Sequence, residues 1–335
     1  MPGVLSEDTL AGLCDHRAAF GAAKPYRHIV IDGFFDPEVA AAMVRDFPAF
    51  EDQSAINELG LVGEKAVHDD MGAIGGIYST IDDALQQREF LGAIERVSGI
   101  EGLLYDPHYV GGGTHENLSG QGLDPHVDFN YHPIRQWHRR LNLIVYLNDE
   151  WEPGWGGTLA LHRDPWADDD EVVEVAPRHN RAVLFETTER SWHGFEPIGT
   201  GLHGEQLSRR SFAVYFYSRE RPSSEVHPPH TTHYVPRRLP EHLQPGRILD
   251  EADLATIESA IEQRNQWIRF LYEREMQLSA RLTREMQGQG WLMVTTRRLA
   301  RELRSGGAID VVAPRGSRRR SALIRARGRS RRAGG

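Results

Sequence analysis

The stretch Leu123-Asp124-Pro125-His126-Val127-Asp128-Phe129 holds the residues around which we expect the rest of the chain to be organised. In an extended strand, residues i and i+2 point to the same side, so His126 and Asp128 would project together. An imidazole and a carboxylate placed in this way can occupy one face of a divalent metal. A second histidine from another strand would complete the two-histidine, one-carboxylate set that leaves open positions on Fe(II). The candidate is His193, in Ser191-Trp192-His193-Gly194-Phe195.

A His-x-Asp triplet alone is weak evidence, because the chain has 16 histidines and the same spacing recurs at residues 68–70 and 162–164. The series that follows His126 distinguishes it from these two. It comprises an apolar strand ending in Tyr146-Leu147-Asn148, the pair Gly156-Gly157, His193, and Arg209 at the start of a further strand. Asp128 adds weight, because a lone carboxylate in an apolar strand is costly to bury unless it is paired or bound to metal.

The composition is that of an ordinary soluble protein. The 335 residues are 39% hydrophobic and 26% charged, with a mean hydropathy of -0.51. We find no apolar run near the roughly 20 residues that a membrane span needs, and no signal-peptide pattern at the start. Cys14 is the single cysteine, which excludes an intrachain disulfide and thiolate metal clusters. We expect no membrane span and a cytoplasmic location.

The chain divides by pattern into five parts. Residues 1–24 are expected to form an N-terminal helix, and residues 25–220 a β-rich domain, followed by a linker over 221–250, a helical appendage over 251–304 and a disordered basic tail over 305–335. Short strands separated by Gly, Pro and Asn favour an antiparallel barrel or jelly roll. Among the flanking helices we expect one that begins at the cap Asp36 and one that carries an apolar stripe over residues 80–98.

The helical appendage shows near-heptad spacing from Leu254 to Leu282. We expect a break at the glycines of residues 288–290 and a second short helix after it. So long an apolar stripe is costly to leave in water, so the helix should either pack on the barrel or form a homodimer. The spacing allows both.

The basic tail contrasts with an acidic body. The whole chain has a net charge of -9, yet residues 297–335 contain thirteen arginines against Glu302 and Asp310. Arginine runs attract phosphate without specificity. Because this tail lacks interleaved aromatic residues and any recognisable module, we expect no specific nucleic-acid partner.

The two-histidine, one-carboxylate set is typical of non-haem Fe(II) oxygenases. An oxygenase of this kind that uses 2-oxoglutarate needs, besides the metal ligands, a cation for the distal carboxylate of that acid. Arg209 and Arg210 are the candidates, and strand parity favours Arg209, whose face includes Ser211 and is the more polar one. An arginine can hold a carboxylate with two hydrogen bonds, and the serine can add a hydroxyl. His108 and His115 can line the same pocket or serve a structural role.

From about residue 26 to 218 the chain resembles the prolyl 4-hydroxylase-like superfamily of Fe(II)/2-oxoglutarate dioxygenases. The resemblance is carried by His126-x-Asp128, the Tyr-Leu-Asn strand ending, Trp155-Gly156-Gly157-Thr158-Leu159, Trp192-His193-Gly194 and Arg209-x-Ser211. It implies a mainly β fold with flanking helices, whose core is a double-stranded β-helix (jelly roll), with the helical segment C-terminal to it.

The resemblance implies a function as well. His126, Asp128 and His193 would bind Fe(II), Arg209 would bind the cosubstrate 2-oxoglutarate, and Tyr146 and Asn142 would line the cosubstrate site. With O2, such an enzyme would hydroxylate a small-molecule or glycan-like substrate and release succinate and CO2. Two alternatives are a peptidyl-prolyl hydroxylase acting on a protein, and a cupin-like metal- or sugar-binding module without oxygenase turnover.

Overall fold

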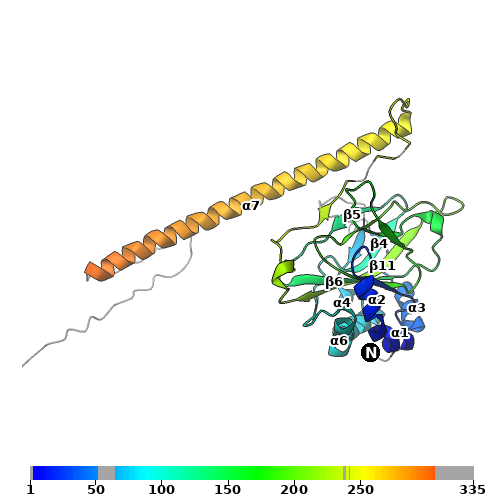
Figure 1. Ribbon diagram of the computed structural model, residues 1–335, viewed down its shortest axis with the longest axis horizontal. Helices are drawn as coiled ribbons and strands as arrows, with labels where there is room; N and C mark the ends of the chain where they lie inside the picture. Colours follow the sequence, from blue (N-terminus) through cyan, green and yellow to red (C-terminus); the bar gives the residue numbers. More distant parts are fainter. Residues whose placement is uncertain (1–2, 52–64, 237–238, 241, 306–335) are drawn as a thin grey trace, which may run out of the picture. The chain divides into compact units, whose positions relative to one another are not determined.

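The computed structural model describes residues 3–51, 65–236, 239–240 and 242–305. Its strands form two antiparallel sheets (Figure 1). Residues from strands of both sheets line one cavity. This arrangement is that of a jelly roll, so the predicted mainly β fold with flanking helices and a C-terminal helix is confirmed.

The larger sheet has seven strands in the order β1-β9-β6-β11-β4-β2, with β3 paired to β11. These strands are β1 (His28–Ile31), β2 (Ala66–His68), β3 (Leu104–Tyr105), β4 (Gly113–Leu118), β6 (His138–Tyr146), β9 (Ala182–Glu186) and β11 (Ser208–Ser218). The central strand β6 has two unlike faces, as its sequence predicts. Leu141, Leu143 and Val145 belong to the main hydrophobic core, whereas Asn142 and Tyr146 line the cavity.

The smaller sheet has five strands in the order β12-β5-β10-β7-β8. They are β5 (Leu123–Val127), β7 (Leu159–His162), β8 (Val172–Val175), β10 (Trp192–Phe195) and β12 (His233–Tyr234). The antiparallel pairing of β10 with β5 sets His193 directly opposite His126. The register of this sheet therefore brings together two histidines that are far apart in the sequence.

In the described part of the chain, helices α1 to α6 come before the second half of the β-rich region, and several of them gather at one side of it (Figure 1). They are α1 (Glu7–Gly12), α2 (Arg17–Ala22), α3 (Pro37–Arg45), α4 (Met71–Ile74), α5 (Gly76–Leu85) and α6 (Arg88–Ser98), with short 3-10 turns at η1 (Leu13–His16), η3 (Pro153–Trp155) and η4 (Ser223–Glu225). Buried residues of these helices, such as Phe20 and Phe90, share one core with Phe216 of β11. Asp36 caps α3 as predicted, since its Oδ1 accepts a hydrogen bond of 2.9 Å from the Glu38 amide.

Two helical predictions were wrong in detail. The single N-terminal helix is replaced by α1 and α2, which are joined by the 3-10 turn η1. The helix expected over residues 80–98 is divided between two helices, because the extended backbone of Gln87 separates α5 from α6. The break lets Leu85 and Phe90 both be fully buried, which one straight helix would not allow on the same sheet.

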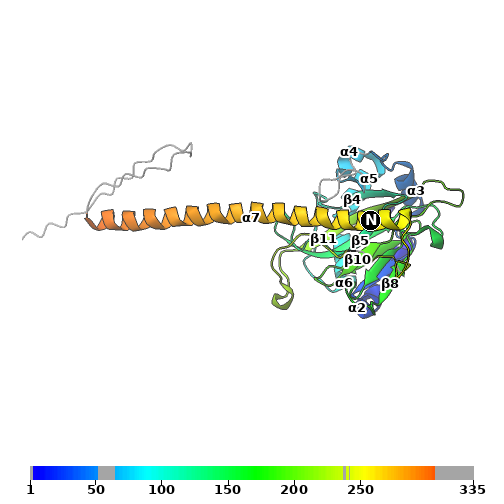
Figure 2. The same ribbon diagram turned by 90° about the horizontal axis from the view of Figure 1, so that it is seen from above.

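The C-terminal region also differs from expectation. Within the predicted linker, β12 adds an edge strand to the smaller sheet by pairing with β5, and so covers backbone groups that an edge would leave exposed. Helix α7 runs from Glu251 to Ser305 without a break at Gly288 or Gly290 (Figure 2). A glycine costs only about 1 kcal/mol in a helix interior, which a helix of this length can absorb.

The chain forms two compact units, one up to Ile261 and one from Glu262 onward. Beyond residue 305, the predicted basic tail lies outside the described residues. Among the helices of the described part, none combines the length and the apolar character that crossing a membrane requires.

Candidate metal centre

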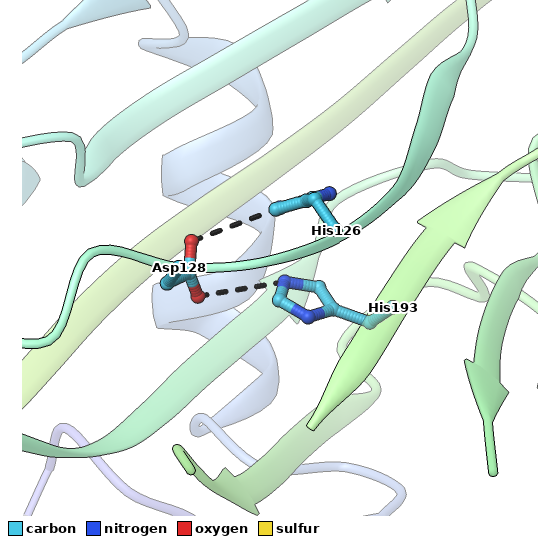
Figure 3. Close-up of side chains that lie close together, drawn as sticks. All are labelled: His126, Asp128 and His193. Atoms are coloured by element: carbon cyan, nitrogen blue, oxygen red, sulfur yellow. Dashed lines mark ion pairs between the residues drawn. The ribbon is translucent and has the colours of Figure 1, made fainter. Parts of the chain in front are cut away.

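His126 of β5, Asp128 just after β5 and His193 of β10 form one cluster, in which both histidines are buried and Asp128 is largely buried (Figure 3). One potential ligand atom from each lies within 4.8 Å of the others. The Nε2 atom of His126 is 3.7 Å from Oδ1 of Asp128, and the Nε2 atom of His193 is 3.6 Å from Oδ2. Within the described ranges, no other set of three such side chains comes this close together. The sequence-predicted triad is therefore assembled in space.

Hydrogen bonds fix the tautomers of both histidines. Nδ1 of His126 is 2.9 Å from the Asp124 carbonyl, and Nδ1 of His193 is 2.9 Å from the Ser191 carbonyl. A carbonyl can only accept, so each Nδ1 carries its proton and each Nε2 offers a lone pair toward Asp128. Burial, with the neighbouring His193, lowers the pKa of His126 to about 3, and burial also lowers the pKa of His193. Both imidazoles are thus neutral and in the form that binds a metal.

Asp128 is held ionised by its surroundings. Burial alone would raise its pKa, but the positive charge of the neighbouring Arg139 is the largest opposing influence, and the pKa lies below its ordinary value. The Asn142 amide donates a 2.8 Å hydrogen bond to Oδ2, and Nη2 of Arg139 lies 3.1 Å from the same oxygen. Asn142, which the family resemblance places in the cosubstrate site, therefore contacts the candidate metal ligand directly.

Arg139 is a site residue that the sequence did not reveal. Its guanidinium is stacked between the rings of Tyr215, 3.6 Å from the ring centroid, and Phe129, 4.5 Å away. Simple alternation along β6 would turn Arg140 toward the cavity instead. The register of β6 against β11 skips Arg140, however, because Leu141 pairs with Phe216 and Arg139 with Tyr217. This bulge reverses the parity and is invisible in the sequence.

Gly194 permits the close approach of the two histidine strands. A Cβ built at this position would lie 2.5 Å from the Leu123 carbonyl oxygen and 2.9 Å from the Pro125 nitrogen. Any other residue would push β10 away from β5. The glycine of the Trp-His-Gly motif is therefore needed to keep His193 opposite His126.

The seven residues predicted for the site all line a single cavity of about 110 Å³. They are His126, Asp128, His193, Arg209, Tyr146, Asn142 and Ser211. One water needs roughly 10–15 Å³ of such space, so the cavity has room for several waters or a small organic acid. The structure brings the predicted residues together, while their roles in binding remain predictions.

Arg209 is a buried cation on the cavity side of β11. Its Nε donates a 2.6 Å hydrogen bond to the Gly157 carbonyl, its Nη2 lies 3.3 Å from the Tyr146 hydroxyl, and its guanidinium stacks 4.0 Å from the Phe195 ring centroid. No carboxylate of the described residues forms an ion pair with it, and burial lowers its pKa. Arg210 points to the opposite face, where Nε lies 3.0 Å from the Glu116 carboxylate.

The glycine pair of the Trp-Gly-Gly motif lies against this arginine. Gly157 has a φ of +65°, and a Cβ there would be 3.1 Å from Cδ of Arg209. A larger residue would be strained in its backbone and crowded against the arginine. The motif therefore allows a loop backbone to approach Arg209 and accept its Nε hydrogen bond.

Of the other histidines considered from the sequence, one lines the cavity and two pair with residues elsewhere. His115 lines the cavity, and its buried Nε2 has no hydrogen-bond partner among the described residues. His108, the other open candidate, instead lies 3.2 Å from Arg135. At the second His-x-Asp triplet, His162 pairs with Asp170 at 2.7 Å, outside the cavity. The motifs that follow His126 in the sequence therefore correctly distinguished the triplet at residues 126–128, which joins the cluster, from the triplet at residues 162–164.

Tyr234 also belongs to the site, although it lies in the range predicted as a linker. It is in β12, it lines the cavity, and its ring centroid is 5.2 Å from that of His126. The surrounding sequence is rich in Pro and His and has no strand-like alternation, so no pattern indicated it. The cavity wall therefore extends beyond the region that the sequence motifs cover.

Residues 113–217 match the model of a protein family described as the 2OG-Fe(II) oxygenase superfamily. This match includes the residues of the triad and Arg209, and it confirms the resemblance that the motifs carry. One curated relative is the mouse protein named prolyl 3-hydroxylase OGFOD1, which is 29% identical over a region covering 33% of this chain and 23% of the relative. The chain thus spans about a quarter of the length of that relative.

Solved structures also resemble the chain, and two examples follow. A prolyl-4-hydroxylase from Pseudomonas putida is 18% identical, and the match covers 63% of this chain and all (100%) of that one, with a TM-score of 0.42. HygX from Streptomyces hygroscopicus, solved with nickel and 2-oxoglutarate bound, is 13% identical over 62% of this chain and 92% of that one, with a TM-score of 0.38.

Proposed function

We propose that this chain, whose residues 113–217 form a domain of the 2OG-Fe(II) oxygenase superfamily, is a 2-oxoglutarate-dependent dioxygenase that hydroxylates a small-molecule or glycan-like substrate. Succinate and CO2 would be its co-products. One observation carries the proposal: a single cavity holds a buried His-Asp-His cluster and a buried arginine that forms no ion pair with a carboxylate of the described residues.

The donor set fits Fe(II). Two neutral imidazoles present Nε2 and one ionised carboxylate faces them, which is the set that binds non-haem Fe(II) and leaves positions open for other ligands. Asn142 and Arg139 both engage Oδ2 of Asp128 and so fix the orientation of the carboxylate. Bound iron, together with 2-oxoglutarate and O2, supplies the oxidising chemistry for a C–H bond.

Arg209 fits the distal carboxylate of 2-oxoglutarate. A guanidinium binds a carboxylate with two parallel, charge-assisted hydrogen bonds, and these are stronger where water is excluded. The Tyr146 and Ser211 side chains lie at the same cavity wall and can add hydroxyl contacts. An anionic ligand would also neutralise a cation whose burial is otherwise costly.

Aromatic side chains pack against the charged and metal-binding groups of this site. Phe195 covers the guanidinium of Arg209, Tyr215 covers that of Arg139, and Tyr234 packs on His126. Exclusion of water strengthens each charged contact in the cavity and protects reactive species from side reactions. These three aromatic residues would hold the charged groups in position around the iron and 2-oxoglutarate.

A second candidate function is hydroxylation of a prolyl residue in a peptide or protein. The observation in its favour is the similarity to the mouse protein named a prolyl 3-hydroxylase. A cupin-like binding module without turnover is the weaker alternative, because such a module has no use for a buried arginine at the cavity wall. Fe(II) binding alone would not separate these functions, whereas succinate formation would.

Metal analysis after anaerobic reconstitution tests the iron site. We expect about one iron per chain in the wild type, and loss of most of it in His126→Ala and in Asp128→Ala. His162→Ala is the matched control, because it removes the histidine of another His-x-Asp triplet that lies outside the cavity. Full iron content and unchanged turnover in Asp128→Ala would refute the site.

Succinate formation tests the substrate class. The purified chain is supplied with Fe(II), 2-oxoglutarate and O2, and succinate release is compared between a panel of saccharides and small metabolites and a panel of proline-containing peptides. Stimulation by the first panel supports the proposal, and stimulation by the peptides alone supports the second candidate. Iron binding with no succinate from any member, even uncoupled, would favour a binding module.

A further inference from the structure

Helix α7 carries a stripe of apolar side chains that solvent reaches. Ile261, Ile268, Leu271, Leu278 and Leu282 recur with heptad spacing, and each is between 51% and 59% exposed. If Ile261 is heptad position a, the a positions are 261, 268, 275 and 282, and the d positions are 257, 264, 271 and 278. Apolar residues at a and d over three to four heptads are typical of a coiled coil.

Two charged residues interrupt the apolar stripe, and they indicate in which orientation a second helix can pack against it. Arg264 is at position d and Glu275 at position a. In a parallel pair of identical helices, a faces a and d faces d. In-register packing would therefore place Arg264 against Arg264 and Glu275 against Glu275 of the other helix. No parallel register can bring Arg264 to Glu275, because a d position does not meet an a position.

An antiparallel pair resolves both conflicts at once. There, each a position faces a d position of the second helix. With a two-fold axis between residues 269 and 270, Arg264 faces Glu275 of the second copy. By symmetry, Glu275 faces Arg264 of the second copy, so the dimer contains this contact twice. Between residues 257 and 282, the same register pairs the other layers as apolar with apolar: Ile257 with Leu282, Ile261 with Leu278, and Ile268 with Leu271.

The flanks of the seam agree with this register. Antiparallel packing sets the two g edges side by side, so Trp267 of one helix lies beside Arg274 of the other, a pairing suited to a cation–π contact. On the e edges Asn265 meets Tyr272. No like charges oppose each other at these positions. The paired region, residues 257–282, spans about 39 Å at 1.5 Å per residue.

We propose that a second copy of this chain covers the α7 stripe, as an antiparallel coiled-coil homodimer centred between residues 269 and 270. The charge complementarity of Arg264 with Glu275 selects this partner over a parallel copy. The inference concerns assembly only and stands whether or not the proposed oxygenase activity is correct.

Charge exchange in the full-length chain tests the orientation, with analytical ultracentrifugation as the readout. Arg264→Glu should raise the dimer dissociation constant on the order of 100-fold, because it creates two like-charged layers worth roughly tenfold each. Arg264→Glu/Glu275→Arg should restore the dimer, since both layers are again paired. In a parallel dimer neither variant changes the number of like-charged layers, so equal dissociation constants for all three proteins would overturn the proposal. A wild-type chain that stays monomeric at micromolar concentration would also overturn it.

Disulfide trapping gives an independent test. In a Cys14→Ser background, which removes the only native cysteine, the chain with Ile257→Cys is mixed with the chain with Leu282→Cys and oxidised. The antiparallel register predicts a crosslinked dimer from the mixture and none from either protein alone, because residue 257 lies about 38 Å from its own copy. Efficient crosslinking of Ile257→Cys alone would show a parallel arrangement and refute the register.

Discussion

Replacing Arg209 by methionine should make the protein more stable and unable to bind its cosubstrate. In the ligand-free protein this buried guanidinium has a carbonyl and a phenol as hydrogen-bond partners but forms no ion pair with a carboxylate of the described residues. Replacing a buried ion pair by apolar residues of similar volume is often neutral or stabilises a protein by about 1–4 kcal/mol, and we expect the same range for this buried cation. The lost bond to Gly157 offsets about 1 kcal/mol of this. The net gain is therefore up to about 3 kcal/mol, which corresponds to a rise in Tm of up to roughly 12 °C.

The same substitution should remove the stabilisation that the ligand gives. Losing a bidentate charge-assisted contact costs about 2–4 kcal/mol, or ~30- to 1000-fold in 2-oxoglutarate affinity. At a ligand concentration 100 times the wild-type Kd, the wild type gains about 2.7 kcal/mol. Arg209→Met should gain less than about 0.9 kcal/mol under the same conditions. Thermal unfolding in anaerobic buffer with Fe(II), with and without 2-oxoglutarate, measures both effects.

Arg210→Met is the matched control, because the adjacent arginine lies on the opposite face of β11. Its removal leaves the buried Glu116 carboxylate, 3.0 Å from Nε of Arg210, without that partner. We expect a loss of about 2 kcal/mol in stability, with the shift caused by 2-oxoglutarate unchanged. If Arg209→Met responds to 2-oxoglutarate as the wild type does, or if Arg210→Met loses the response, the assignment of the cation is wrong.

Three further predictions concern the metal centre and the tail. Gly194→Ala should lower iron affinity roughly 10–100-fold, because its Cβ would lie 2.5 Å from the Leu123 carbonyl oxygen and displace His193. The control Gly199→Ala, whose Cβ would have its nearest atom 3.5 Å away, should bind iron normally. Equal iron affinities for the two variants would contradict the argument that Gly194 sets the spacing of β5 and β10. Arg139→Leu should weaken iron binding by a similar ~10–100-fold, because Asp128 loses the cation 3.1 Å from its Oδ2. Arg140→Leu should leave iron affinity unchanged. If Arg140→Leu weakened iron binding more than Arg139→Leu, Arg140 and not Arg139 would be the residue that faces Asp128. A chain ending at Arg304 should retain full succinate formation, and loss of turnover on removing the tail would show that the tail belongs to the active enzyme.

The sequence by itself determined the local part of the site. Alternation along a strand is a backbone property, so it placed His126 with Asp128, separated Arg209 from Arg210, and divided β6 into a core face and a cavity face. Capping at Asp36 was equally local, because the side chain bonds an amide two residues away. In each case the residues that decide the geometry are close together in the chain.

Only the tertiary structure decided what depends on register between distant segments. The bulge opposite Phe216 turned Arg139 toward Asp128, and a bulge has no sequence pattern of its own. Tyr234 lies beside His126 because β12 pairs with the edge of β5. The residues of β12 do not by themselves specify β5 as the partner strand. The break between α5 and α6 followed from the need to bury both helices on one sheet. These features arise from packing and hydrogen bonding between elements, which no single stretch of the chain encodes.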